Sequence, residues 1–193
     1  MKMKKIIVCA VLALMATAVV AQQEGKIRFG LNLGGAVPSG GGLGVALDAQ
    51  LGYNIADNMN IGVRGGLAYM LGTDNATTIS SAGNSNFLGT FTFFLNPGNG
   101  AFAPFFGGGT GVYALGATSL SSGGASTEGG ILFGGMLTAG FELGKFRVAA
   151  DYNLLPTSPI KYTAGDVADR KNSYFGITIG FYLGGGKWGK DKR

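Results

Sequence analysis

The chain has 193 residues, of which 37 are glycine, 46% are hydrophobic and only 13% are charged. Soluble domains usually carry about 25% charged residues, so this composition argues against an ordinary water-exposed surface. The chain contains no histidine and a single cysteine. A transition-metal site, a disulfide framework and histidine-based catalysis are therefore not expected.

The first 21 residues have the features of a secretory signal peptide. Lys2, Lys4 and Lys5 form a basic start, and an uncharged apolar run over 6–20 leads to Ala21. This run is shorter than the roughly 20 residues of a spanning helix, so a membrane anchor is the weaker alternative. We predict cleavage after Ala21, which leaves 12 basic and 10 acidic residues. This near-neutral balance gives no indication of nucleic-acid binding.

From residue 26 onward, bulky apolar residues recur at every second position. In 175–183 the odd positions are Phe, Ile, Ile, Phe and Leu, and the even positions are Gly, Thr, Gly and Tyr. Successive side chains of a strand point to opposite faces, so the pattern predicts strands with one apolar and one polar side. Eight are predicted, over 26–35, 43–53, 59–71, 87–95, 101–115, 131–143, 146–155 and 174–184.

The connections between these strands alternate in length. Short ones rich in turn residues are predicted at 54–58, 96–100 and 144–145, and longer ones at 36–42, 72–86, 116–130 and 156–173. Tight turns at one end and long loops at the other are typical of a barrel in an outer membrane, with the turns on the periplasmic side.

A soluble β-sandwich would also segregate apolar residues, but its outer faces would be about a quarter to a third charged. Here the polar faces hold mainly Gly, Ala, Thr and Asn, which suit the narrow interior of a closed barrel. We therefore predict an all-β fold: an eight-stranded antiparallel up-and-down transmembrane β-barrel over 22–184. A basic tail follows at 185–193. The fold implies contact with outer-membrane lipid, and we expect a monomer.

One strand has no clear orientation. The segment 101–115 is apolar on both parities, with Phe102, Phe106 and Val112 forming a slightly better outer face. The glycines on its other face either permit tight curvature or leave room for bulky neighbours. Both its orientation and the role of these glycines stay open.

Six charged residues lie on the inward parity of the predicted strands: Arg28, Asp48, Arg64, Glu142, Arg147 and Asp151. Neighbouring strands bring opposite charges together, and a buried charge is tolerated when it is paired. These residues are predicted to form either an ion-pair plug that fills the barrel or a charged constriction for small solutes.

The eight-strand layout, the segment Pro-Phe-Phe-Gly-Gly-Gly-Thr-Gly at 104–111 and the closing strand resemble the small outer-membrane β-barrel proteins of the OmpA/OmpX type. The final strand also resembles the signal read by the barrel-assembly machinery, with Tyr174, Gly176, Ile179 and Phe181 at the expected spacing. The resemblance implies that this machinery is a partner during biogenesis. No segment corresponds to a peptidoglycan-binding domain.

These observations favour a structural or surface-interaction role over an enzyme. Any ligand is expected at the loops 72–86, 116–130 and 156–173, because loops on rigid scaffolds carry binding functions. No cofactor is expected. The alternative is a narrow pore that uses the lumen charges.

Overall fold

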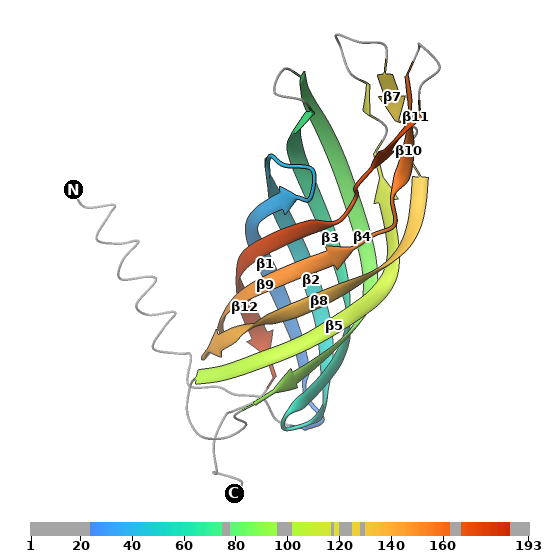
Figure 1. Cartoon of the computed structure of the whole chain (residues 1–193). Helices are drawn as coiled ribbons and strands as arrows, with labels where there is room; N and C mark the ends of the chain where they lie inside the picture. Colours follow the sequence, from blue (N-terminus) through green and yellow to red (C-terminus); the bar gives the residue numbers. More distant parts are fainter. Residues whose placement is uncertain are drawn as a thin grey trace, which may run out of the picture.

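The computed structural model describes residues 24–74, 78–95, 102–116, 118–119, 125–127, 130–162 and 167–185. Eight strands close into one antiparallel barrel (Figure 1), in the order β1-β12-β9-β8-β5-β4-β3-β2. Their bounds are β1 Ile27–Pro38, β2 Leu43–Ala56, β3 Met59–Asp74, β4 Thr78–Phe94, β5 Phe102–Leu115, β8 Gly130–Leu143, β9 Phe146–Leu154 and β12 Tyr174–Gly184. The predicted up-and-down barrel is thereby confirmed.

The predicted signal peptide and the tail from residue 186 lie outside the described residues, as does the predicted turn at 96–100. Cleavage after Ala21 therefore stays a prediction. Within the part of the chain that the structure describes, no helix has the length and apolar character needed to cross a membrane.

The two faces of each strand meet different surroundings, as the alternation predicts. In β12, Gly176 and Thr178 are buried towards the lumen, whereas Ile177 and Ile179 are exposed on the outer surface. All eight strands carry large exposed apolar side chains outside, for example Leu33, Leu47, Leu67, Phe87, Phe106, Leu137, Tyr152 and Ile179. The period of two is the physical reason, since adjacent residues of a strand point in opposite directions.

The structure decides the orientation of β5. Phe102, Phe106 and Val112 are exposed, and Phe105 is buried. The inward glycines allow close strand approach, because a Cβ added at Gly107 would clash with the carbonyl oxygen of Phe91 on β4. Of the two possible outer faces of this strand, the one that was slightly better by sequence is therefore the correct one.

The predicted loops at one end are wrong in part, because they contain further strands. β3 and β4 pair with each other as far as Asp74 and Thr78, within the predicted loop 72–86. β6 (Thr118–Ser119), β7 (Ala125–Thr127), β10 (Ser158–Tyr162) and β11 (Val167–Arg170) form a separate four-stranded sheet. We call this end the sheet end (Figure 1). These four strands have only 2, 3, 5 and 4 residues, too few for a period of two to be recognised in the sequence, although pairing still satisfies their backbone groups.

The opposite end, here the turn end, carries the tight connections. Gly144 and Lys145 join β8 to β9, and Gly144 has a positive φ of 62°, which glycine adopts without strain. The β2–β3 turn is tighter than the predicted 54–58, because β2 continues to Ala56 past a register shift after Asn54. The β1–β2 connection, at the sheet end, is also shorter than predicted, because β1 extends to Pro38, within the predicted loop 36–42.

Candidate functional site

The barrel lumen is where the polar chemistry of the chain gathers. The six residues predicted to face inward do so: Arg28, Asp48, Arg64, Glu142, Arg147 and Asp151. Five are at most 6% exposed, and the Arg64 side chain is 11% exposed. They come from five different strands, β1, β2, β3, β8 and β9, so their meeting depends on closure of the sheet.

The first charged layer lies near the turn end. The Arg28 Nη2 atom lies 2.6 Å from Glu142 Oε1, and the Arg147 Nη1 atom lies 3.5 Å from the same oxygen. β8 and β9 place Glu142 and Arg147 directly opposite each other, while Arg28 crosses the lumen from β1. In this layer one carboxylate therefore pairs with two guanidinium groups. Aromatic rings further stabilise the two positive charges.

Two rings flank these guanidinium groups. The Arg28 guanidinium lies 4.1 Å from the centroid of the Tyr182 ring, and that of Arg147 lies 3.8 Å from the centroid of the Phe105 ring. Both distances are within the range of cation–π attraction, which is stronger when the cation is removed from water. The aromatic faces thus partly offset the surplus positive charge of this layer.

Tyr182 connects this layer to the next. Its hydroxyl accepts a hydrogen bond from Arg147 Nη1 (3.1 Å) and donates one to Gln50 Oε1 (2.6 Å). The Gln50 Nε2 atom in turn donates to Thr90 Oγ1 at 3.2 Å. A continuous chain of hydrogen bonds therefore runs from the arginines to the middle of the barrel.

The central layer has the opposite excess of charge. Arg64 Nη2 lies 2.9 Å from Asp48 Oδ2 and 2.9 Å from Asp151 Oδ2. The Asn32 Nδ2 atom donates to the other oxygen of Asp48 at 2.6 Å. Two carboxylates here share one guanidinium, whereas in the first layer two guanidiniums share one carboxylate. The three positive and three negative groups balance only across both layers.

Towards the sheet end most of the buried lumen side chains are apolar, with a few buried amides such as Asn84 and Asn153 among them. Buried side chains of one cluster fill this part of the lumen: Ala36, Ala68, Met70, Leu88, Tyr113, Met136, Leu155 and Tyr174. The Tyr113 hydroxyl donates to Asn153 Oδ1 at 2.9 Å, so its polar atom is satisfied within the cluster. Where Arg64, Asp151 and Tyr174 meet, a cavity of about 10 Å³ remains, which is at most the space of a single water molecule.

Of the two predicted arrangements, the geometry corresponds to the ion-pair plug. Tyr182 and Tyr113 also belong to this network, although they were not among the predicted residues. The available signal was their inward parity, since Tyr182 follows Gly180 and Tyr113 follows Gly111 on the lumen face. Gly30 on β1 lies opposite Tyr182 and leaves room for its ring, because a Cβ at Gly30 would clash with that ring.

The predicted assembly-signal residues divide between the two faces of β12. Tyr174 and Gly176 face the lumen, whereas Ile179 is exposed outside. The outer ring of Phe181 packs edge-on against Phe146, with 5.5 Å between centroids. Recognition of this strand by the assembly machinery stays a prediction.

Lys145 closes the turn end beneath the first charged layer. Its Nζ atom donates to the carbonyl oxygen of Gly184. Burial, assisted by the nearby charge of Arg28, lowers the pKa of Lys145 below its ordinary value, and Glu142 acts in the opposite direction. Among the described residues, no group of three or more His, Cys, Asp or Glu side chains is placed to hold a metal ion.

Comparison with known proteins gives a match in architecture alone. No family model matches the chain, and no curated protein matches its sequence. Among solved structures, the outer membrane protein OprG from Pseudomonas aeruginosa is similar with a TM-score of 0.56 and 13% identity, over 84% of this chain and 98% of that one. Neisserial surface protein A matches with a TM-score of 0.47 and 12% identity, over 82% and 95%. The fold is that of the small eight-stranded outer-membrane barrels.

Proposed function

We propose that the protein is an integral outer-membrane β-barrel with a closed lumen and a structural or surface-interaction role. The observation that carries this proposal is the ring of exposed apolar side chains on all eight strands. Leu33, Leu67 and Ile179 are 62%, 61% and 63% exposed. The charged side chains described on the barrel strands all point to the lumen, as a lipid-facing surface requires.

A protein partner would explain this surface less well than a bilayer. Exposed apolar patches beyond a few hundred Å² mark contact sites on soluble proteins, but they occupy one side of the molecule. Here the apolar residues encircle the barrel, so that only a surrounding apolar medium covers them all. The closed sheet also meets the requirement that backbone groups in hydrocarbon be hydrogen-bonded within the protein.

The layered lumen supports a barrel that does not conduct. Paired charges fill the turn end and centre, and apolar side chains fill the space towards the sheet end. An ion crossing this path would have to break the pairs and then enter an apolar layer, both at high free-energy cost. The narrow pore is therefore the less favoured function.

The sheet end supports a role outside the cell. The β3–β4 hairpin and the sheet of β6, β7, β10 and β11 project there, whereas the turn end has short connections. With the turns in the periplasm, this sheet faces the exterior, where rigidly held loops commonly bind partners. The inward charges serve packing, so we propose no enzymatic activity.

Two measurements test the membrane and lumen parts of the proposal. The full chain is expected in the outer-membrane fraction with heat-modifiable gel migration, and a water-soluble product would overturn it. In planar bilayers we expect no channel steps. Reproducible steps that change with Arg64→Ala or Glu142→Ala would favour the pore instead.

A third measurement separates the structural from the surface role. In cells lacking the protein, leakage of a periplasmic enzyme is compared after complementation with the full chain or with a chain whose residues 158–170 are replaced by a short Gly-Ser linker. Restoration by both chains would support envelope integrity through the barrel. Restoration by the full chain alone would support a role for the external sheet.

A further inference from the structure

β1 and β12 meet at the seam of the barrel, and we propose that Asn54 and Lys145 form a clamp that keeps this seam closed at the turn end. The two strands are the first and the last of the described barrel strands, so hydrogen bonds rather than a connecting loop hold them together. An open seam in hydrocarbon would leave backbone groups unpaired. The clamp goes beyond the proposed function, because it assigns closure of the barrel to two particular side chains.

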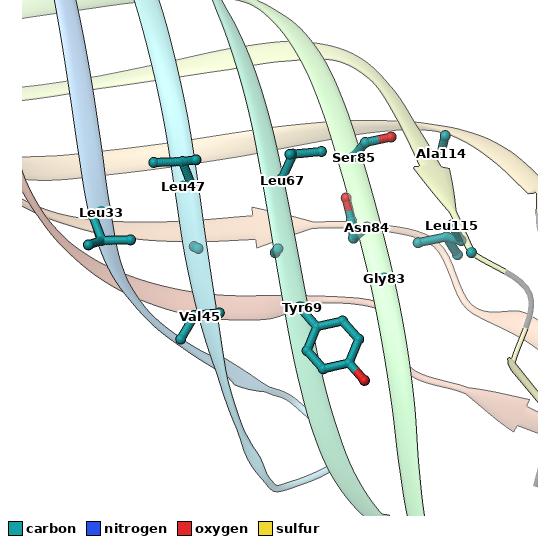
Figure 2. Close-up of a pocket in the computed structure, with 13 residues that line it drawn as sticks. Leu33, Val45, Leu47, Leu67, Tyr69, Gly83, Asn84, Ser85, Ala114 and Leu115 are labelled. Atoms are coloured by element: carbon teal, nitrogen blue, oxygen red, sulfur yellow. The ribbon is translucent and has the colours of Figure 1, made fainter.

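The wall away from the seam shows why the seam needs a fastening. Around an outer hollow of about 580 Å³, Leu33, Leu47 and Leu67 lie in register across β1, β2 and β3 (Figure 2). These strands follow one another in the chain, so a short connection keeps each pair close together when it opens locally. Pairing then re-forms at a small cost in loop-closure entropy. The strands of the seam have no such connection among the described residues.

At the sheet end, backbone hydrogen bonds extend the seam. The register of β1 and β12 runs as far as Pro38 opposite Tyr174. One position further, the Ser39 N–H donates to the carbonyl oxygen of Ser173 at 2.9 Å. The backbone ladder itself therefore fastens this end of the seam.

At the turn end, β12 finishes in a bend. The Gly185 N–H donates to the carbonyl oxygen of Ile27 at 2.9 Å, which is the last backbone bond described along the seam. Gly184 and Gly185 both have positive φ, 78° and 83°, a conformation that glycine adopts without strain. A Cβ at Gly184 would also clash with the Ile27 carbonyl oxygen. The bend therefore requires glycine, and it takes the chain out of the line of the strand.

Two side chains bind the carbonyl oxygens of this bend from opposite sides of the seam. Lys145, in the turn before β9, donates from Nζ to the carbonyl oxygen of Gly184. Asn54, on β2, donates from Nδ2 to the carbonyl oxygen of Gly185 at 3.2 Å. The strand order is β9-β12-β1-β2. The end of β12 is therefore held by the turn beside it and, across β1, by β2.

Asn54 is itself firmly positioned. It is fully buried, and its Oδ1 accepts a hydrogen bond from Nδ2 of Asn60 on β3 at 2.8 Å, which leaves Nδ2 of Asn54 directed to Gly185. Its backbone carbonyl accepts from the Gly25 N–H at 2.8 Å, and its N–H donates to the carbonyl oxygen of Lys26 at 3.0 Å. One residue thus fastens both the segment before β1 and the end of β12 to the β2–β3 hairpin.

The clamp lies directly beneath the first charged layer. Gly185 is buried, and a Cβ placed on it would lie 3.6 Å from the Cβ of Arg28. Opening the seam here would admit water to the Arg28–Glu142 pair, whose attraction depends on a low local dielectric. Closure by the clamp therefore also protects the plug from the periplasmic side.

Amide hydrogen exchange, measured by NMR on the full chain in detergent micelles, tests the clamp. The Gly185 amide reports on the turn end of the seam, and the Ser39 amide reports on its sheet end. Asn54→Ala should speed exchange at Gly185 about tenfold, the effect of losing roughly 1.4 kcal/mol of local stability, and leave Ser39 unchanged. Lys145→Met keeps most of the stem but loses the donor. It should speed exchange at Gly185 by a smaller factor, because Lys145 is partly exposed.

Asn172→Ala is the matched control. Asn172 is also a buried amide, and its Nδ2 donates to the carbonyl oxygen of Pro156 at 2.7 Å, but it lies at the sheet end. This variant should leave exchange at Gly185 unchanged. An unchanged Gly185 rate in either clamp variant that forms the barrel would overturn the clamp. Equal increases at Gly185 and Ser39, or the same increase at Gly185 in the control, would do so as well.

Heat-modifiable migration, measured on every variant, reports separately whether the membrane barrel forms. If the first clamp variant does not form a barrel, Lys145→Met decides alone. A water-soluble product from the unmodified chain would contradict the proposed function, whereas a barrel with unaltered exchange contradicts only the clamp.

Discussion

The inner and outer faces of this barrel are built by the same strands and follow opposite rules. On β2, Asp48 is buried against Arg64, while its neighbour Leu47 is 49% exposed on the outside. Inside, the charged side chains and many of the polar ones pair with particular partners on other strands. Outside, the apolar side chains form a continuous surface, and no single contact on it is essential.

This difference predicts different responses to mutation. A residue on the inner face is sensitive because its partner is left unpaired at low dielectric. A residue on the outer face is sensitive only to a change in polarity, since the surrounding lipid adapts to size and shape. Three substitutions test this contrast.

The largest effect is expected for Arg64→Ala. The change leaves Asp48 and Asp151 buried without their shared cation, and removing one partner of a buried pair costs about 3–5 kcal/mol. Urea unfolding of the barrel in phospholipid vesicles gives the free energy of unfolding. As a control, Arg64→Met combined with Asp48→Asn and Asp151→Asn should recover most of the loss. Equal destabilisation of both variants would show that unpaired charge is not the cause of the loss.

A charge on the outer face should come next. Val63 is 40% exposed and pairs with Leu51 and Gly89 in the middle of the outer surface. Val63→Arg should lower the free energy of unfolding in vesicles by about 2–4 kcal/mol, the cost of a cation near the bilayer midplane. Val63→Ile keeps the polarity and should change little. An arginine tolerated as well as isoleucine would contradict the assignment of this face to lipid.

A smaller effect is expected for Tyr182→Phe. The ring that packs beneath Arg28 is kept, but the hydroxyl between Arg147 and Gln50 is lost. Leaving these groups unsatisfied should cost about 1–3 kcal/mol. Tyr152→Phe, on the outer face, is the matched change and should stay within about 0.5 kcal/mol. Similar losses for the two variants would show that the hydrogen-bond chain contributes nothing particular.

The sequence predicted the barrel well because its strongest signal is local. Alternation along a strand needs only the period of two, so the faces of β1 and β12 follow from their own residues. The same signal failed where both parities carry similar residues. At the sheet end, Ser, Thr and Asn on both sides of β4 concealed its full length, and apolar residues on both sides of β5 left its orientation open.

The identity of the inward charges was likewise readable from the sequence, but their pairing was not. Arg28 meets Glu142 across 114 positions of the chain, and Arg64 meets Asp151 across 87. Which charges meet depends on the register of the closing strands and on the tilt of the sheet, properties that no single segment carries. The aromatic partners of the arginines were hidden for the same reason.

By itself, the sequence determined the fold class, the two faces of most strands and the set of residues in the lumen. These follow from the geometry of an extended chain and from the cost of placing charge in lipid. Tertiary structure alone decided how the lumen is layered, where the additional sheet forms and where the outer face is hollow. Each of these depends on distances between strands that become defined only when the sheet closes.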